Sequence, residues 1–268
     1  MALIMDTPKQ AQQARELAFD APSNVERVAD AIASRRPLPA LCCPDLASGY
    51  QFQRNLSAYM NGGLSCDLKA GATSAEVQQH FGLSGPLVGS LYARGKLLSG
   101  CEVVVTDGQE LEFEIAVVVD NSGNPVSLVP AVEVVYLEFS QPADLSVANV
   151  VAANLGADRF ICGEPVPWDR SLSQFTITVF KDGNKVADLT NDYVFGSPAA
   201  GVEWIIGEAR RWHLWQEQPE GRTLLLGTCG NAMKVSSGDY CANFGPLGEV
   251  RFAIRCRDSV EDTEDMSS

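Results

Sequence analysis

Histidine is scarce in this sequence, which contains only His80 and His213 among 268 residues. A catalytic cysteine needs a neighbouring base, most often a histidine, so cysteine–histidine catalysis is not expected. The eight cysteines include no C-x-x-C pair, which argues against a zinc site built from thiolates. The chain also lacks a G-x-x-x-x-G-K-[ST] phosphate loop, a strand-linked G-x-G-x-x-G turn, a G-x-S-x-G nucleophile turn and an H-E-x-x-H metal helix. A metal or catalytic site in this chain is therefore expected to rely on other residue types.

Positive charge and long apolar runs are lacking as well. The chain has 20 Lys and Arg against 34 Asp and Glu, a formal net charge of −14. Nucleic acid and anionic membranes favour basic surfaces, so neither is an expected partner. No apolar run approaches the roughly 18 to 20 residues that span a bilayer, and the first residues do not have the pattern of a secretory signal. The cysteines are scattered and expected to be mostly buried thiols, which predicts a protein of the reducing cytoplasm.

The spacing of apolar residues predicts helices first and strands later. Apolar residues at three- and four-residue intervals predict helices over 8–19, 23–36 and 47–63. From about residue 97, short segments rich in Val, Ile and Phe predict strands at 101–106, 112–119, 132–139, 174–180, 223–228 and 249–255. Tight turns are expected at 122–124 and 182–184, and one further helix at 201–218. The expected fold class is mixed α/β and β-rich.

This pattern divides the chain into three parts. Residues 1–62 are a predicted N-terminal helical region, and residues 63–256 are a predicted β-rich, metal-binding catalytic domain. Residues 257–268 contain acidic residues and almost nothing apolar, which predicts a disordered tail.

Three glutamates stand in apolar predicted strands. Residues i and i+2 of a strand share a face, so Glu112 and Glu114 point the same way and Phe113 the other way. Glu133 is the one charged residue within the apolar segment 131–135. Buried carboxylates are costly to desolvate and raise one another's pKa, and a divalent cation removes both penalties. With no His or Cys nearby the site would be all-oxygen, which favours Mg²⁺ or Mn²⁺. The alternative is an exposed E-x-E pair at a strand edge that binds nothing.

The order of several short motifs resembles a known family. The chain reads Lys69-Ala70-Gly71-Ala72-Thr73, Val77-Gln78-Gln79-His80-Phe81-Gly82-Leu83, Val88-Gly89-Ser90-Leu91, Glu112-Phe113-Glu114-Ile115-Ala116, Pro130-Ala131-Val132-Glu133-Val134-Val135, Gly196-Ser197-Pro198 and Leu226-Gly227. In this order, over about residues 48–254, the motifs resemble the fumarylacetoacetate hydrolase superfamily, in particular its 2-keto-4-pentenoate hydratase and 4-oxalocrotonate decarboxylase branch. The resemblance implies a β-fold of rolled mixed sheets with an N-terminal helical cap, and homodimers or larger assemblies.

The resemblance also implies roles for individual residues. The glutamates of the family's E-x-E and P-A-x-E motifs hold the metal, and they correspond to Glu112, Glu114 and Glu133. The metal of the family chelates a 2-oxo acid or its enol through carboxylate and carbonyl oxygens. Lys69 corresponds to the family lysine and is expected to be catalytic, by binding substrate or assisting proton transfer; the alternative is a solvated surface lysine. The other positions expected to contact the substrate are Thr73, Ser74, Leu87, Glu138, Asn154, Ser197 and Gly227.

Four positions depart from the family pattern. Leu87 stands where the family's P-D-F-G turn has an acidic residue, and Glu138 where an arginine commonly follows the P-A-x-E strand. Ala153 replaces the aspartate of V-A-D-N-A-S, and Ser197 replaces the histidine of G-H-P. The loss of these polar groups predicts a substrate that is less acidic and more apolar than the dienoic acids of aromatic catabolism.

The leading hypothesis is a divalent-metal-dependent lyase, that is a hydratase, dehydratase or decarboxylase, which acts through an enolate on a small 2-oxo or enolisable carbonyl substrate. One alternative is a C–C bond hydrolase of a diketo acid, which needs a general base for water, and His80 is the only histidine near the expected pocket. Another is a degenerate member that binds a ligand without catalysis. The lost polar residues favour this last alternative, whereas the three retained glutamates oppose it, because buried carboxylates without a counter-ion destabilise a fold.

Overall fold

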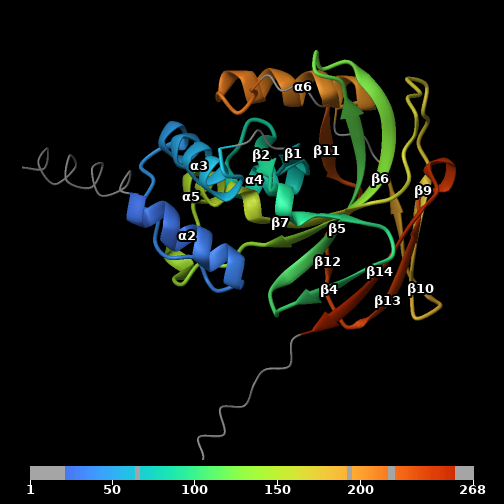
Figure 1. Cartoon of the computed structure of the whole chain (residues 1–268), viewed down its shortest axis with the longest axis horizontal. Coiled ribbons are helices and arrows are strands. Elements are labelled where there is room, and N and C mark those ends of the chain that lie inside the picture. Colours follow the sequence, from blue (N-terminus) through green and yellow to red (C-terminus); the bar gives the residue numbers. More distant parts are fainter. Residues whose placement is uncertain (1–21, 64–66, 192–194, 217–220, 257–268) are drawn as a thin grey trace, which may run out of the picture.

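The computed structural model of the chain describes residues 22–63, 67–191, 195–216 and 221–256 (Figure 1). The helix predicted over 8–19 and the acidic tail predicted at 257–268 lie outside the described residues. Within them, helices α2 (Pro22–Ser34), α3 (Leu46–Met60) and α5 (Val147–Ala152) gather at one side of the molecule, α6 (Pro198–Arg211) lies along the top, and two sheets of strands form the other side (Figure 1). None of the described helices is long and apolar enough to cross a membrane.

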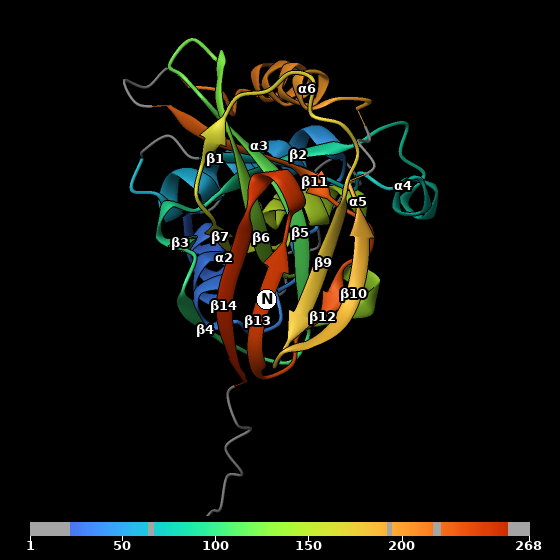
Figure 2. The same ribbon diagram turned by 90° about the vertical axis from the view of Figure 1, so that its right-hand side faces the viewer.

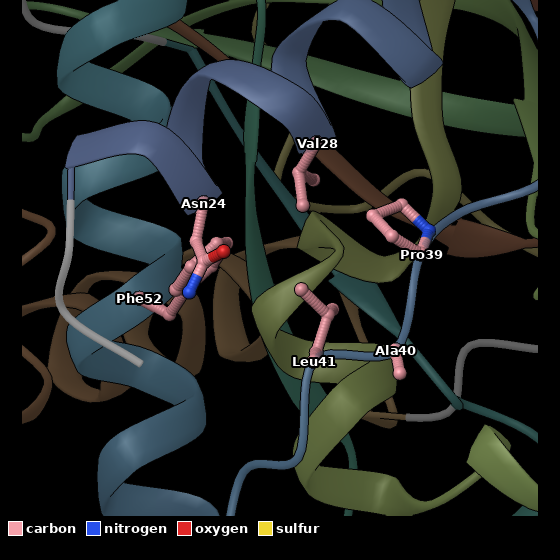
Figure 3. A pocket seen from close by; sticks show the side chains of 6 residues that line it. All are labelled: Asn24, Val28, Pro39, Ala40, Leu41 and Phe52. Carbon is pink, nitrogen blue, oxygen red and sulfur yellow. The ribbon is translucent and has the colours of Figure 1, made fainter. Parts of the chain in front are cut away.

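The N-terminal helices pair with each other, as their apolar spacing predicts. Helix α2 (Pro22–Ser34) packs on helix α3 (Leu46–Met60). A capping box begins α3: the Asp45 carboxylate accepts the Ser48 backbone N–H at 2.8 Å, and the Ser48 hydroxyl accepts the Asp45 backbone N–H at 3.2 Å. A small, mostly apolar pocket between the two helices and the segment after α2 is lined by Asn24, Val28, Pro39, Ala40, Leu41 and Phe52 (Figure 3). The remaining described α-helices are α4 (Ala75–Phe81), α5 (Val147–Ala152) and α6 (Pro198–Arg211).

The larger of the two sheets is built around one long antiparallel hairpin. Strand β5 (Gln109–Val119) pairs with β6 (Pro125–Tyr136), and both are central in the sheet. The strand order is β2-β1-β11-β5-β6-β7-β3, with β12 paired to β5 and β8 paired to β6. The other bounds are β1 Asp67–Gly71, β2 Leu87–Leu91, β3 Lys96–Leu98, β7 Ala157–Cys162, β8 Val166–Pro167, β11 Arg222–Thr228 and β12 Met233–Lys234. Two of the pairs, β1–β11 and β3–β7, are parallel. The sheet is therefore mixed.

The second sheet has the order β10-β9-β13-β14-β4 and faces the viewer in Figure 2. Its strands are β4 Cys101–Val105, β9 Thr176–Lys181, β10 Asn184–Thr190, β13 Gly238–Asn243 and β14 Glu249–Cys256. Val103, Ile177 and Ile254 of this sheet share one continuous buried core with Phe113 and Ile115 of β5. The odd-numbered side chains of β5 therefore lie in the core that joins the two sheets.

The opposite face of the large sheet is covered by the helical region. Ala116, which shares a face with Glu112 and Glu114, belongs to a second buried cluster that contains Val28 of α2 and Phe52 of α3. Residues of β6, β7 and β11 on the same face, among them Val129, Ala131, Phe160 and Leu225, belong to it too. Alternation along β5 thus places the carboxylates on the helix-covered face of the large sheet.

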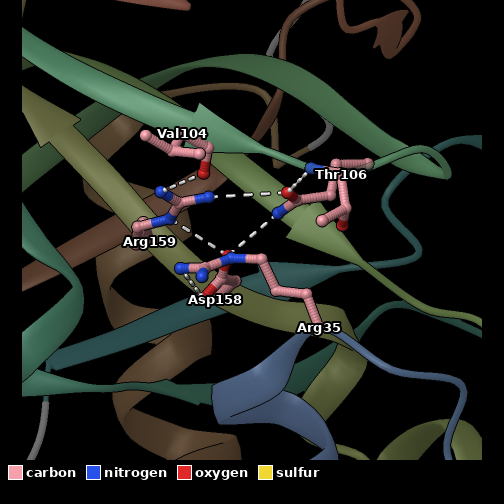
Figure 4. Close-up of polar contacts among 6 residues, drawn as sticks. Arg35, Val104, Thr106, Asp158 and Arg159 are labelled. Carbon is pink, nitrogen blue, oxygen red and sulfur yellow. Dashed lines mark hydrogen bonds and ion pairs between the residues drawn. The ribbon is translucent and has the colours of Figure 1, made fainter. Parts of the chain in front are cut away.

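A polar cluster connects the end of α2 to the sheets (Figure 4). The Asp158 carboxylate of β7 accepts hydrogen bonds from Arg35 Nε at 2.9 Å, Arg159 Nε at 3.0 Å and Gln109 Nε2 at 2.9 Å. Arg159 also donates to the Val104 carbonyl oxygen at 2.8 Å. Asp158 and Arg159 together therefore join the end of α2 to β4, β5 and β7.

Most elements expected from the sequence are confirmed. All six predicted strands are present, and the predicted turns at 122–124 and 182–184 close the hairpins β5–β6 and β9–β10. The sequence missed β1 and β2, which precede residue 97, and also β7 and β13 after it, and α6 ends at Arg211 rather than 218. The prediction of mostly buried thiols is wrong for the described cysteines, because only Cys162 and Cys229 among them are buried. The mixed α/β, sheet-rich fold class is confirmed.

Candidate metal centre

The strand register brings the three glutamates together. Glu112 lies directly opposite Glu133 in the β5–β6 ladder, and Glu114 lies opposite the small Ala131. One carboxylate oxygen from each of the three glutamates lies within 4.8 Å of one from each of the others. Glu114 and Glu133 are completely buried, whereas Glu112 is half-buried. An exposed E-x-E pair at a strand edge, the alternative considered above, does not describe this arrangement.

Each buried carboxylate uses one oxygen for the protein and leaves the other without a donor. Glu114 Oε2 accepts the Gly227 backbone N–H at 2.8 Å, and Glu133 Oε1 accepts the Lys69 ammonium at 2.6 Å. Glu114 Oε1 and Glu133 Oε2 are buried with no hydrogen-bond donor. A buried carboxylate oxygen without a donor destabilises the fold, and either a shared proton or a cation at these two atoms would remove that cost.

Burial and mutual repulsion make these groups hard to ionise in the absence of a cation. Burial, followed by repulsion from Glu133 and Glu112, raises the pKa of Glu114 well above its ordinary value. Burial also raises the pKa of Glu133 to about 7, although the adjacent Lys69 ammonium opposes the shift. A protonated Glu114 can donate to Glu133, and a divalent cation can replace that proton.

These shifts predict that the metal-free protein loses stability as the pH rises. The folded chain keeps protons that the unfolded chain releases above the ordinary carboxyl pKa of 4.5, so the free energy of unfolding falls between pH 4.5 and about 7. For a shift of this size the free energy of unfolding falls by about 3 kcal/mol. Urea denaturation in chelator at several pH values measures the fall, and a Glu114→Gln protein is the control because it lacks one titrating carboxyl. Equal pH dependence in the two proteins would contradict the prediction.

Lys69 is part of the cluster rather than a surface residue. It lies on β1, which is parallel to β11, and its side chain is 2% exposed. Its ammonium donates to Glu133 Oε1 and, at 3.2 Å, to the Leu155 carbonyl oxygen. Burial alone would lower the pKa of Lys69, but Glu133 and the other two glutamates raise it above the ordinary value, so the group is a cation. The alternative of a solvated lysine is wrong.

Thr73 and Gly227 lie beside Glu114. A bulge interrupts the β11–β5 ladder between Leu225 and Thr228, and Gly227 has a φ of +103° there. A Cβ at Gly227 would lie 2.5 Å from Thr73 Cγ2, so only glycine allows Thr73 to lie against the backbone that binds Glu114. Thr73 therefore packs against the residue whose N–H binds Glu114.

Asn154 and Leu87 lie on the Lys69 side of the centre. Asn154 is fully buried, and its amide makes two hydrogen bonds with the Ser90 backbone of β2. Leu87 is buried in β2 opposite Gly71 of β1. Both residues contribute to the β1–β2 wall, and direct substrate contact by either stays a prediction.

Three other predicted substrate residues have different local roles. The hydroxyl of Ser74 caps α4 by accepting the Val77 N–H at 3.2 Å, and that of Ser197 caps α6 by accepting the Ala200 N–H at 3.2 Å. Glu138 is exposed and accepts the Tyr136 hydroxyl at 2.9 Å. Since β6 ends at Tyr136, Glu138 has left the ladder that holds Glu133. Its negative charge therefore gives no support to the prediction of a less acidic substrate.

Two further observations bear on the site. His80 is exposed in the last turn of α4 with its ring edge-on to Phe81, and no histidine joins the three carboxylates in the described part of the chain. The Leu155 carbonyl oxygen, by contrast, contacts Lys69 and was not anticipated. A backbone carbonyl has no signature of its own in a sequence, so only the structure could identify it.

Comparison with known proteins yields similarities in both sequence and fold. No protein-family model matches the chain. A 2-keto-4-pentenoate hydratase of Burkholderia vietnamiensis is 27% identical over 252 residues, 85% of this chain and 95% of the relative. The TodF product hydratase of Pseudomonas putida is 25% identical over 229 residues, 78% of this chain and 84% of the relative. The structure of 4-oxalocrotonate decarboxylase from Pseudomonas putida G7, complexed with magnesium and adipate, superposes with a TM-score of 0.76 at 18% identity, over 91% of this chain and 98% of that one.

These matches confirm the resemblance that the order of motifs predicts, and they confirm the predicted fold. The relatives compared by sequence are hydratases, and the chain aligns with nearly their whole length. The assembly state and the cytoplasmic location stay predictions.

Proposed function

We propose that the chain, which resembles the hydratase and decarboxylase branch of the fumarylacetoacetate hydrolase superfamily in sequence and fold, is a divalent-metal-dependent lyase. Its substrate is a small 2-oxo acid or a related enolisable carbonyl compound, and its metal is Mg²⁺ or Mn²⁺. The observation that carries the proposal is the pair of buried carboxylate oxygens, one on Glu114 and one on Glu133, that have no donor and stand beside a third carboxylate.

The donor set fits a small, hard cation. Three carboxylates provide oxygen ligands only, which Mg²⁺ and Mn²⁺ prefer, and fewer than the six of an octahedral shell, so positions remain for water and substrate. Lys69 and the Gly227 N–H orient Glu133 and Glu114 by holding one oxygen of each. Outer hydrogen bonds of this kind are typical of metal sites, where they fix the direction of the ligating atoms.

The chain's own residues suit chemistry on a 2-oxo acid. The cation, when bound, would supply positive charge beside the carboxylate and carbonyl oxygens of the substrate. Lys69 is a buried cation with three N–H donors, of which Glu133 and the Leu155 carbonyl use two, so the third can hold a substrate oxygen or deliver a proton. The helix-covered face of the sheet excludes water from this side of the site, which strengthens each charge interaction.

Hydration and decarboxylation are the reactions that the relatives support. Two relatives are named as hydratases, and the protein of similar fold is a decarboxylase that was complexed with magnesium and a dicarboxylate. Both reactions place negative charge on a carbon next to a carbonyl group. The buried ammonium of Lys69 and a cation on the glutamates are suited to stabilise that charge. The His-dependent hydrolase alternative gains no support, because His80 lies exposed on α4.

Metal binding is tested by thermal and urea denaturation with and without Mn²⁺. At a free Mn²⁺ concentration of about 100 times the dissociation constant, the free energy of unfolding should rise by about 2.7 kcal/mol, and a chelator should reverse the rise. A Glu114→Gln protein keeps an acceptor for the Gly227 N–H but loses a ligand, so its Mn²⁺ affinity should fall at least about 100-fold. Glu102→Gln, on the exposed surface of β4, is the matched control and should bind Mn²⁺ like the unaltered chain.

The reaction is tested with 2-keto-4-pentenoate and 4-oxalocrotonate as substrates of the Mn²⁺-loaded protein. Loss of the conjugated enol absorbance without release of CO₂ identifies a hydratase, and release of CO₂ identifies a decarboxylase. Turnover of neither compound by a protein that binds Mn²⁺ would contradict a lyase for these two substrates and favour the more apolar substrate or a ligand-binding protein. Turnover that persists in chelator would contradict the metal requirement.

A further inference from the structure

The chain makes an unusual left-handed turn next to Lys69. Asn154, Leu155 and Gly156 follow α5 and have φ values of +56°, +55° and +72° in succession. Glycine and asparagine adopt this conformation readily, but leucine does so rarely, because its Cβ crowds the following carbonyl group. All three residues are buried, so the surrounding structure must hold the turn in place.

The Asn154 side chain holds one end of this turn. Its Oδ1 accepts the Ser90 N–H at 2.7 Å, and its Nδ2 donates to the Ser90 carbonyl oxygen at 2.5 Å. Ser90 belongs to β2, the edge strand of the large sheet, so the Asn154 amide satisfies backbone groups that have no further strand to pair with. One oxygen and one N–H of Asn154 are therefore engaged in the wall of the site.

The Leu155 side chain occupies a slot that two glycines leave open. A Cβ at Gly71 would lie 2.8 Å from Leu155 Cδ1, and a Cβ at Gly89 would lie 3.1 Å from the same atom. A Cβ at Gly89 would also lie 3.2 Å from Lys69 Cγ and 3.4 Å from Asn154 Oδ1. The Lys69 stem, the Leu155 side chain and the Asn154 amide thus meet at Gly89.

We infer that Asn154 is a positioning residue for Lys69, acting through the left-handed turn that aims the Leu155 carbonyl oxygen at the lysine ammonium. The turn gives Lys69 Nζ a second acceptor at 3.2 Å, besides Glu133 Oε1 at 2.6 Å. These two acceptors fix the direction of the ammonium and leave its third N–H for the substrate side. The inference rests on the proposed function of the glutamate centre, and it replaces the expectation that Asn154 binds the substrate itself.

The test compares Asn154→Ala with Asn61→Ala. Asn61 is also buried and also forms one donor and one acceptor bond with backbone groups, to Ser57 at 3.0 Å and from Ala93 at 2.9 Å, but it caps α3. We expect Asn154→Ala to weaken Mn²⁺ binding and to lower kcat by about 10-fold each, with a smaller change in KM, because Lys69 orients a ligand. Asn61→Ala should leave all three within about 2-fold. A second variant, Leu155→Ala, serves as the test if Asn154→Ala fails to fold. It keeps the Asn154 amide but empties the slot at Gly89, so it should also lower kcat.

Crystal structures of the variants give a readout that does not depend on metal or activity. The distance from Lys69 Nζ to the Leu155 carbonyl oxygen should exceed hydrogen-bonding range in Asn154→Ala and stay near 3.2 Å in Asn61→Ala. An unchanged distance in Asn154→Ala, or equal losses of kcat and Mn²⁺ affinity in the two alanine variants, would overturn the inference. An unaltered chain that binds no Mn²⁺ would instead contradict the proposed function, and the distance would still decide the role of Asn154.

Discussion

A Lys69→Met protein is expected to lose about 3–5 kcal/mol of unfolding free energy in the absence of metal at about pH 8, because Glu133 is left as a buried charge without its partner. The methionine is similar in length and apolar, so it keeps most of the contacts of the lysine stem. The Oε1 atom of Glu133 loses the donor that it has in Lys69, while Glu112 continues to repel the Glu133 carboxylate.

The loss should depend on pH and on metal. Without Lys69 the pKa of Glu133 should rise beyond about 7, so the folded protein binds a proton that the unfolded chain releases. The deficit is therefore largest at high pH and shrinks on acidification towards about pH 7, below which Glu133 is protonated in both folded proteins. Mn²⁺ should restore part of it, since a divalent cation compensates the same carboxylates.

Urea denaturation of both proteins in chelator and in Mn²⁺ measures these changes. Lys96→Met is the matched control: Lys96 forms an ion pair with Asp67 at 3.0 Å but is 42% exposed, so its replacement should cost less than about 1 kcal/mol. Turnover by Lys69→Met should fall by about 10²–10⁴, as for loss of a group that transfers a proton. Equal stability of the two methionine variants in chelator would contradict the buried ion pair, and full turnover would contradict a catalytic Lys69.

The sequence predicted the glutamate centre well because strand alternation is a strict rule. Glu112 and Glu114 had to share a face of β5, and the apolar Ala116 and Val118 that follow on this face indicated that it is buried. What brought Glu133 opposite Glu112 was the register of the β5–β6 hairpin, and the SGN turn at 122–124 indicated that these two strands would pair.

The position of Lys69 could not be predicted in the same way. Strand β1 reads Asp-Leu-Lys-Ala-Gly, which has no β-branched or aromatic residue and alternates over only four positions, so its strand signal is weak. It forms because β2 and β11 provide backbone partners on both sides, and this is a long-range effect. The left-handed Leu155 is equally invisible, since its conformation depends on Ser90 and on the slot at Gly89.

Motif matching says less about a residue's role where the chain leaves the regular strands. Glu138 was aligned with a pocket residue by counting from Glu133, but β6 ends at Tyr136 and the count no longer follows the sheet. Ser74 and Ser197 were matched to pocket motifs, and both turn out to be helix caps. A serine directly before a helix commonly acts as its N-cap, so motif position alone does not separate a capping serine from one that contacts substrate.

The second large effect is expected from Asp158→Ala, which should lower the free energy of unfolding by about 2–4 kcal/mol. Asp158 is 8% exposed and is the shared acceptor of Arg35, Arg159 and Gln109 (Figure 4). Its removal leaves two guanidinium groups without their carboxylate, and they are only 20% and 12% exposed. Arg35 must then find water, and Arg159 keeps the Val104 carbonyl oxygen but loses the acceptor of its Nε–H.

The same substitution tests how firmly the N-terminal helices are coupled to the β-rich part. Arg35 follows α2, and apart from its ion pair with Asp158 the segment after α2 meets the sheets through the Leu38–Phe139 bridge and buried apolar contacts. If the helices and the sheets unfold as one unit, Asp158→Ala should lower the midpoint of a single unfolding transition. Hydrogen exchange should then become faster to the same extent in α2 and β6. If the helical region is a separate unit, exchange should accelerate in α2 alone.

Asp239→Ala is the control for the loss of an arginine-bound carboxylate, because Asp239 pairs with Arg255 at 3.0 Å while 74% exposed, and its replacement should cost less than about 1 kcal/mol. Mn²⁺ affinity should stay within about 2-fold in both variants, since neither aspartate contacts Glu112, Glu114 or Glu133 in the described structure. If Asp158→Ala and Asp239→Ala unfold at the same urea concentration, the cluster at the end of α2 contributes no more to the free energy of unfolding than a surface ion pair. An accompanying loss of Mn²⁺ affinity would show instead that β7, whose Phe160 lies opposite Glu133, transmits the change to the metal centre.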